Sequence, residues 1–465
     1  MRYVSTRGRA PKLAFDDVVL SGLARDGGLY VPESWPEVSR DEMRRWAALD
    51  YASLAVEVMA PFTEGVISRD RLADLARGAY AGFRHKAVTP LSQLGINDWL
   101  LELYHGPTLA FKDLALQFLG RLFDELLSAR GESVTILGAT SGDTGSAAIE
   151  ACKDRERIKI FMLHPKGRVS EVQRRQMTTV MSKNVFNIAV EGNFDDCQAL
   201  VKTLFNDLAF RDSVSLSAVN SINWARVMAQ VVYYFHAALS LGGPDRPVSF
   251  SVPTGNFGDV FAGYVAAKMG LPIERLIVAT NINDILARTL NSGEHALGDV
   301  HPTMSPSMDI QVSSNFERLL FDLYDRDGAA VDRLMDELKE KRRFTLDQGV
   351  LSKAAERFAA ERVDEDETRA TMAAVHAESE RLIDPHTAVG LAAARRQAVA
   401  GVPMVTLSTA HPAKFPDAVT AATGEHPVLP ASLADLLERP ERCDSLANDA
   451  GALKAYMLAR VESRP

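Results

Sequence analysis

One lysine of this chain stands where a side chain could do chemistry. Lys112 lies between the aromatic Phe111 and the acidic Asp113, where a loop gives way to an amphipathic helical pattern. A side chain at such a junction points toward the helix N-terminus, where backbone N–H groups and the helix dipole favour anionic ligands. A lysine that loses its water there can be neutral and nucleophilic. Most lysines are solvated surface charges, so the interpretation of Lys112 depends on polar turns elsewhere in the chain.

The first polar turn follows an apolar run and precedes an expected helix. Its residues are Thr140, Ser141, Gly142, Asp143 and Thr144. In an open α/β sheet, ligands bind beyond the carboxyl ends of the strands, and hydroxyls at a helix N-terminus suit a carboxylate or phosphate. The simpler alternative is a well-capped helix, because Ser, Thr and Asp are favoured at N-caps. Five consecutive polar or glycine positions favour binding.

A second turn of this kind follows the apolar run 248–252. It contains Gly255, Asn256, Phe257 and Gly258. Glycines there allow positive φ and let successive N–H groups point at one anion, such as a phosphate. The spacing is not G-x-G-x-x-G, and the chain has no G-x-x-x-x-G-K-[ST], which weakens a nicotinamide or Walker interpretation.

Two further segments carry polar side chains that could be functional or merely structural. Thr409 follows the last apolar run, 402–407, where a hydroxyl could bond a heterocyclic nitrogen or simply cap the strand. Ser221 and Arg226 lie near the start of another expected helix, where a hydroxyl and a guanidinium could hold a phosphate. Together, a junction lysine, a carboxylate cradle, a phosphate loop and a strand-end hydroxyl are the groups needed to hold pyridoxal phosphate.

The elements that must position these residues indicate a doubly wound α/β fold. Short β-branched runs alternate with helical periodicity from about Ser133 to Asn281, which is typical of a parallel sheet covered by helices. The expected strands are Ser133–Ala139, Ile158–His164, Val185–Val190, Val214–Val219, Val248–Val252, Arg275–Thr280 and Val402–Leu407. Helices are expected at Asp195–Asp207 and Asn223–Ser240, the second capped by Asn220 or Ser221.

Three domains are expected along the chain. A mostly helical N-terminal domain spans 1–85, an α/β domain with the lysine spans 86–240, and an α/β domain with the phosphate loop spans 241–465. The last includes a charged helical insertion at about 330–381.

Composition excludes several classes of function. The 465 residues carry 52 basic and 61 acidic side chains in no long blocks, a net charge of -9, which argues against a nucleic-acid partner. Three distant cysteines give no zinc or redox spacing and favour a reducing compartment. No metal site and no membrane span is expected, and the chain is interpreted as cytoplasmic, a monomer or a homodimer.

At these residues the sequence resembles the threonine synthases, a family of fold-type II pyridoxal-phosphate enzymes related to the tryptophan synthase β subunit. The segments that carry the resemblance are 5–8, 26–32, 105–113, 138–145, 220–226, 253–259, 315–318 and 408–412. The Asp-Gly-Gly-Leu and His-Gly-Pro-Thr-x-x-Phe-Lys-Asp motifs are specific to threonine synthases, and the N-terminal domain and insertion resemble the longer subgroup.

The resemblance implies the substrate O-phospho-L-homoserine and the products L-threonine and phosphate. Lys112 would carry the cofactor and move protons at the substrate. Ser141 to Thr144, with Thr140, would cradle the substrate carboxylate, with Asp143 at the cofactor oxygen. The 255–258 loop, including Asn256 and Phe257, would hold the cofactor phosphate. Thr409 would meet the pyridine nitrogen, and Ser221, Asn223 and Arg226 would bind the substrate phosphate. Many fold-type II enzymes carry Asn where this chain has Asp143, which leaves the role of Asp143 open.

Three alternatives remain at this point. The nearest is another pyridoxal-phosphate lyase that releases a keto acid and ammonia from a phospho-amino acid. A non-catalytic relative would bind the ligand without turning it over, against which the retained Lys112 argues. A nicotinamide dehydrogenase would share the α/β core, but its glycine spacing is missing.

Overall fold

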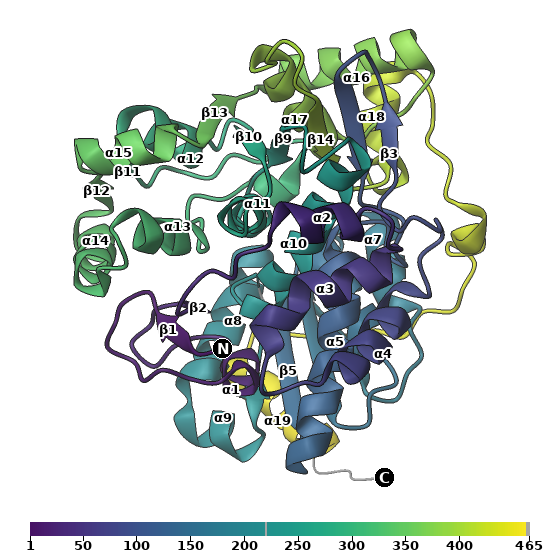
Figure 1. The fold of residues 1–465 in the computed structure, drawn as a ribbon. Helices are drawn as coiled ribbons and strands as arrows, with labels where there is room; N and C mark the ends of the chain where they lie inside the picture. Colours follow the sequence, from purple (N-terminus) through teal and green to yellow (C-terminus); the bar gives the residue numbers. More distant parts are fainter. Residues whose placement is uncertain (219–220, 462–465) are drawn as a thin grey trace. The chain divides into compact units, whose positions relative to one another are not determined.

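The chain forms two compact units, each built from two stretches of sequence. The structure, a computed structural model, describes residues 1–218 and 221–461 (Figure 1). Unit 1 comprises Met1–Phe111 and Ser221–Pro427, and unit 2 comprises Lys112–Asn220 and Val428–Pro465. The units therefore divide the chain differently from the expected boundaries at 85 and 240, because segments far apart in sequence pair within one sheet.

Unit 2 is a five-stranded parallel sheet with helices packed on it. The strand order is β15-β7-β6-β5-β8. The strands are β5 Val134–Ala139, β6 Ile158–Pro165, β7 Val185–Val190, β8 Leu216–Ser217 and β15 Asp444–Leu446. The helices are α5 Lys112–Arg130, α6 Asp143–Cys152, α7 Glu171–Thr178, α8 Phe194–Asn206, α9 Leu208–Ser213 and α19 Ala450–Val461. Its core contains Phe161 and Ile188 from the sheet, with Met457 of α19 against them.

Unit 1 holds a six-stranded sheet in the order β13-β10-β9-β14-β4-β3. All pairs are parallel except β3 with β4. The strands are β3 Leu91–Gln93, β4 Asp98–Glu102, β9 Val248–Pro253, β10 Ile273–Thr280, β13 Phe358–Arg362 and β14 Met404–Ser408. The helices that matter most for the site are α10 Trp224–Ser240, α11 Gly258–Lys268 and α17 Pro385–Arg396. Figure 1 shows α17 beside β9 and β14, against which it packs.

The remaining elements of unit 1 belong to its N-terminal part, to the stretch between β10 and α17, and to the segment after β14. They are β1 Tyr3–Ser5, α1 Phe15–Ser21, β2 Tyr30–Pro32, α2 Arg40–Trp46, α3 Tyr51–Thr63, α4 Arg69–Tyr80, α12 Ile285–Ser292, β11 Glu294–Ala296, η1 Pro306–Met308, α13 Phe316–Leu323, α14 Gly328–Lys341, β12 Arg343–Thr345, α15 Gln348–Ala355, α16 Glu365–Ser379, η2 Pro412–Lys414 and α18 Pro416–Thr423. A short turn, η3 Ala431–Leu433, belongs to unit 2.

Several details differ from the sequence-based expectation. The strands expected between 133 and 281 form two sheets, because β9 and β10 pair with β14 and β13 while β5, β6 and β7 pair with one another. The expected helical insertion contains β13, an edge strand parallel to β10. The expected strand Val214–Val219 shortens to β8, with Val219 outside the described residues. The expectation of α/β architecture itself is confirmed.

Helix α10 begins after a different cap from the expected one. Asn223 is its N-cap, because its side chain accepts from the Ala225 N–H. Asn220, the expected cap, lies outside the described residues. No helix within 1–218 or 221–461 is long and apolar enough to cross a membrane.

Close packing of α5 on α6 makes one glycine replaceable only at a cost. A Cβ at Gly120 would lie 2.2 Å from the Ala151 carbonyl oxygen. Gly120→Ala should therefore lower the free energy of unfolding by ~1–3 kcal/mol, although alanine favours helices. The matched control is Gly349→Ala in α15, where a Cβ meets nothing within 4 Å and stability should not fall. Urea unfolding of both variants checks this, and equal effects would contradict the packing argument.

Candidate active site

Lys112 is the first residue of α5, as the sequence predicts, and its side chain is buried, with 8% of the residue exposed. The Nζ atom lies 3.3 Å from the Asp143 Oδ2 atom. The residue before it is also fixed, because the Phe111 N–H donates to the Thr409 carbonyl at 2.8 Å. Lys112 is therefore not a solvated surface charge, and a buried amine beside a carboxylate is a candidate for a functional group.

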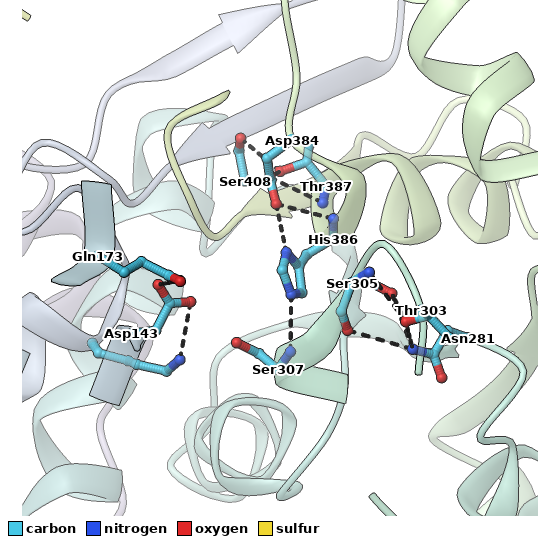
Figure 2. Close-up of polar contacts among 11 residues, drawn as sticks. Asp143, Gln173, Asn281, Thr303, Ser305, Ser307, Asp384, His386, Thr387 and Ser408 are labelled. Atoms are coloured by element: carbon cyan, nitrogen blue, oxygen red, sulfur yellow. Dashed lines mark hydrogen bonds and ion pairs between the residues drawn. The ribbon is translucent and has the colours of Figure 1, made fainter. Parts of the chain in front are cut away.

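The position of Asp143 answers part of the question that the sequence left open. Its Oδ1 atom accepts from the Gln173 amide at 2.9 Å (Figure 2). Its Oδ2 atom faces Lys112. Gln173 is in turn held by Ser170, whose hydroxyl donates to Gln173 Oε1 at 2.9 Å. The carboxylate is thus fixed from one side and turned toward the amine. Sequence reasoning missed Gln173, which lies thirty residues further along the chain.

The 140–144 turn divides into structural and open positions. The Thr140 hydroxyl oxygen accepts from the Gly142 and Gly145 N–H groups, both at 2.9 Å, so it shapes the turn. Gly142 has φ of 141°, and a Cβ there would lie 2.5 Å from Gln173, so only glycine fits. Ser141 is exposed and Thr144 half-buried. These two hydroxyls stand nearest to solvent in the turn, at the start of α6.

The 255–258 loop joins β9 to α11 and forms the second expected site. The residue with positive φ is Phe257, at 63°, so the loop does not use the positive φ that its two glycines allow. Gly255 is required for another reason, because a Cβ there would lie 2.6 Å from the Ser307 carbonyl oxygen. No side chain caps the N-terminus of α11. Its first N–H groups and the positive end of its dipole therefore suit a phosphate.

Asn315 connects this loop to the Ser221 segment within unit 1. Its Nδ2 donates to the carbonyl oxygens of Asn256 at 3.0 Å and Ser221 at 3.1 Å. Arg318, one turn later on α13, donates to the Ile222 carbonyl at 2.6 Å and to Asn315. The two loops that were expected to bind phosphate groups thus share one buried support.

Arg226 lies in the first turn of α10 and is 5% exposed. Its Nε and Nη1 atoms are buried and have no hydrogen-bond partner among the described residues. Burial lowers the pKa of its guanidinium to about 10. A desolvated cation with unused donors is costly unless an anion completes it.

Asn223, the third residue expected here, has another occupation. Its amide donates to the Val19 carbonyl at 2.8 Å and accepts from the Ala225 N–H at 3.0 Å. Both ends of the side chain are engaged within the protein, and 1% of the residue is exposed. The geometry therefore gives Asn223 a role in capping α10, and its contact with the substrate stays a prediction.

Thr409 directly follows β14 and is 5% exposed, so the expected strand-end hydroxyl is in place. His105, near Lys112 in sequence, bonds Glu102 instead, with its Nε2 2.8 Å from Glu102 Oε2. Burial would raise the pKa of Glu102, but hydrogen bonds from His105 and Ser92 outweigh it and lower that pKa to about 2. Within the described parts of the chain, no cluster of His, Cys, Asp and Glu could hold a metal ion.

Comparison with known proteins shows the family to which these features belong. Family models match residues 2–80 (Threonine synthase N terminus), 83–409 (Pyridoxal-phosphate dependent enzyme) and 387–457 (Threonine synthase, C-terminal). The chain is 56% identical to threonine synthase of Pseudomonas aeruginosa, over 98% of each chain. It is 44% identical to that of Corynebacterium glutamicum, over 99% of each. The chain belongs to the threonine synthase family.

Solved structures of threonine synthases agree closely with this fold. The pyridoxal-phosphate-bound threonine synthase of Brucella melitensis is 56% identical, with a TM-score of 0.98 over 100% of both chains. The yeast threonine synthase is 39% identical, with a TM-score of 0.95 over 100% of this chain and 99% of that one. The cofactor of this family member is pyridoxal phosphate, as the sequence indicated.

The described residues fit that cofactor on independent grounds. The buried Lys112 amine is of the type that binds its aldehyde. The uncapped α11 start, with the tight Gly255 contact before it, suits its phosphate. The Thr409 hydroxyl at the end of β14 can meet a ring nitrogen.

Proposed function

We propose that the chain converts O-phospho-L-homoserine and water into L-threonine and phosphate, with Lys112 as its central catalytic residue. The observation that carries the proposal is the buried Lys112 amine, held 3.3 Å from Asp143 in a chain of this family. Phosphate leaves from the γ carbon of the substrate, and the hydroxyl and a proton of water are added across the β and γ carbons. Bound pyridoxal phosphate supplies the electron sink that spreads the negative charge of the deprotonated substrate.

Lys112 has two tasks in this proposal. Its Nζ atom binds the cofactor covalently, and the same amine moves protons at the α and β carbons of the substrate. Asp143, which is held by Gln173, keeps the amine in position before the substrate binds. A positioned base increases the rate of such a reaction by ~10²–10⁴-fold, so the rate depends on where the amine is held.

Each unit supplies its own binding groups. In unit 2, Ser141 and Thr144 with the N-terminus of α6 bind the substrate carboxylate, while Thr140 and Gly142 shape that turn. In unit 1, the loop of Gly255, Asn256, Phe257 and Gly258 holds the cofactor phosphate, and Thr409 meets its ring nitrogen. Arg226 and Ser221 bind the substrate phosphate.

Product analysis tests the function directly. The holoenzyme incubated with O-phospho-L-homoserine should release one phosphate and one L-threonine per substrate and no ammonia. The alternative is another pyridoxal-phosphate lyase, which would form a keto acid and ammonia from a phospho-amino acid. Ammonia without threonine would sink the proposal. Binding without any product would indicate a non-catalytic relative.

We infer a cytoplasmic location, which is supported by three cysteines that form no disulfide. The chain is proposed to act as a monomer or homodimer, which light scattering would establish.

A further inference from the structure

We propose that Asp384 and His386 are positioning residues that set both ends of the cofactor site in unit 1. The inference rests on the proposed roles of the 255–258 loop and Thr409. Asp384 is the N-cap of α17 and is fully buried. His386 is 3% exposed, and neither residue has a place in the reaction as described so far.

The Asp384 carboxylate accepts four hydrogen bonds from His386 and Thr387, in the first turn of α17. Its Oδ2 accepts from the His386 N–H at 2.9 Å and from His386 Nδ1 at 2.7 Å. Its Oδ1 accepts from the Thr387 N–H at 3.2 Å and from the Thr387 hydroxyl. The carboxylate therefore fixes the orientation of both side chains, as Figure 2 shows.

His386 links Asp384 to the segment that lies against the 255–258 loop. The Ser307 N–H donates to His386 Nε2 at 3.2 Å, so Nε2 carries no proton and Nδ1–H donates to Asp384. The Ser307 carbonyl in turn presses on Gly255, whose Cβ, if present, would lie 2.6 Å away. His386 thus sets where the Ser307 backbone stands, and Ser307 sets where the 255–258 loop can lie.

Thr387 links Asp384 to the end of β14, where Thr409 is proposed to meet the ring nitrogen of the cofactor. Its Oγ1 lies 3.0 Å from the Ser408 Oγ atom. Because the Thr387 hydrogen is already donated to Asp384, the Ser408 hydroxyl must be the donor in this contact. Ser408 is the last residue of β14 and directly precedes Thr409. The position of the Thr409 hydroxyl is therefore tied to the same carboxylate.

A second residue, Asn281, holds the chain just before Ser307 through other hydrogen bonds. Asn281, after β10, donates to the Thr303 and Ser305 hydroxyls at 2.9 and 3.0 Å (Figure 2). If Asn281 alone fixed this segment, loss of the hydrogen bond between His386 and Ser307 would not change cofactor binding. The proposal requires that loss of this bond weakens cofactor binding.

Two substitutions at one position separate the two bonds of His386. His386→Gln keeps an oxygen acceptor near the Nε2 position for Ser307, whereas His386→Asn keeps a donor near the Nδ1 position for Asp384 and loses the acceptor. Full-length protein freed of cofactor is titrated with pyridoxal phosphate and, separately, with pyridoxal, which lacks the phosphate. Thermal unfolding of each variant is recorded beside the titrations.

His386→Asn should raise the dissociation constant for pyridoxal phosphate by about tenfold and leave that for pyridoxal unchanged, because a buried N–H loses its acceptor at the phosphate end. His386→Gln should restore most of the affinity. Thr387→Val should weaken both ligands equally, because it acts at the ring. If His386→Asn does not fold, Thr387→Val alone decides between an equal loss and no loss.

The control variant Asn256→Ala separates failure of this inference from failure of the proposed function. It should weaken pyridoxal phosphate and not pyridoxal if the 255–258 loop holds the phosphate. The quantity compared is the ratio of the dissociation constant for pyridoxal phosphate to that for pyridoxal. If this ratio is the same in Asn256→Ala as in the wild type, the assignment of the loop is overturned. The positioning role would be overturned if this ratio changed in Asn256→Ala but in neither His386 variant. It would also be overturned if His386→Asn and His386→Gln had equal effects.

Discussion

Lys112→Ala should reduce turnover of O-phospho-L-homoserine by at least ~10³-fold, because the variant loses both the covalent link to the cofactor and the base that moves substrate protons. The visible absorption band of the bound cofactor should disappear with it. In the wild-type holoenzyme, borohydride reduction and peptide mass spectrometry should place the cofactor mass on the peptide that contains residue 112. Retained turnover in Lys112→Ala would refute the catalytic assignment.

Stability must be separated from chemistry at this position. The alanine variant removes the cation that lies 3.3 Å from the buried Asp143 carboxylate, which costs up to ~3 kcal/mol of the free energy of unfolding. Lys112→Arg keeps a cation opposite Asp143 but places a non-nucleophilic guanidinium there. Lys112→Ala with Asp143→Asn removes the charge imbalance altogether. Both controls should recover stability without recovering turnover, and recovery of turnover in either would mean that Lys112 serves only to balance charge.

The sequence predicted the strands β5, β6, β7, β8, β9, β10 and β14 because their signal is local, and it did not predict β3 or β4. Runs such as Val185–Val190 are rich in β-branched and apolar residues, and β7 has these same bounds. How the strands divide between two sheets was not predictable, because it depends on pairs such as β9 with β14, more than 150 residues apart. The short strands β13 and β15 were missed because each has too few apolar residues to be distinguished from a loop or a charged helix.

The candidate site shows the same division between local and long-range information. The lysine junction and the polar turns were found because each is one segment following one apolar run. Gln173, Asn315 and His386 were missed because each acts on a segment distant in the chain. One signal was available, since Asp384 followed by proline is a standard helix start, but it predicts a cap and not a contact with Ser307. Within the 255–258 loop positive φ occurs at Phe257, while Gly255 is needed for a close backbone contact.

Arg226→Met should weaken substrate binding without weakening the fold. A lost charged hydrogen bond to the substrate phosphate costs ~1.5–3 kcal/mol, so the KM for O-phospho-L-homoserine should rise about 10- to 150-fold. The free energy of unfolding should stay the same or rise, because the variant removes a buried guanidinium whose Nε and Nη1 have no partner among the described residues. Steady-state kinetics and urea unfolding measure the two effects.

A second buried arginine in unit 1 provides the matched control. Arg318 is also desolvated, and burial lowers its pKa to about 9, but its guanidinium donates to the carbonyls of Tyr30 at 3.0 Å and Ile222 at 2.6 Å. Arg318→Met should therefore destabilise the protein by ~2–5 kcal/mol, since it leaves buried acceptors unpaired.

The contrast between the two arginines decides what Arg226 is for. A charged Arg226 with its pKa near 10 costs the folded protein on the order of 3 kcal/mol at neutral pH, and that cost falls only as the pH rises toward the unfolded pKa. A fold gains nothing from such a charge unless an anion completes it. Inorganic phosphate should accordingly raise the melting temperature of the wild-type holoenzyme and not that of Arg226→Met. Equal destabilisation in the two methionine variants, with an unchanged KM for Arg226→Met, would make Arg226 a structural residue and leave the substrate phosphate without its cation.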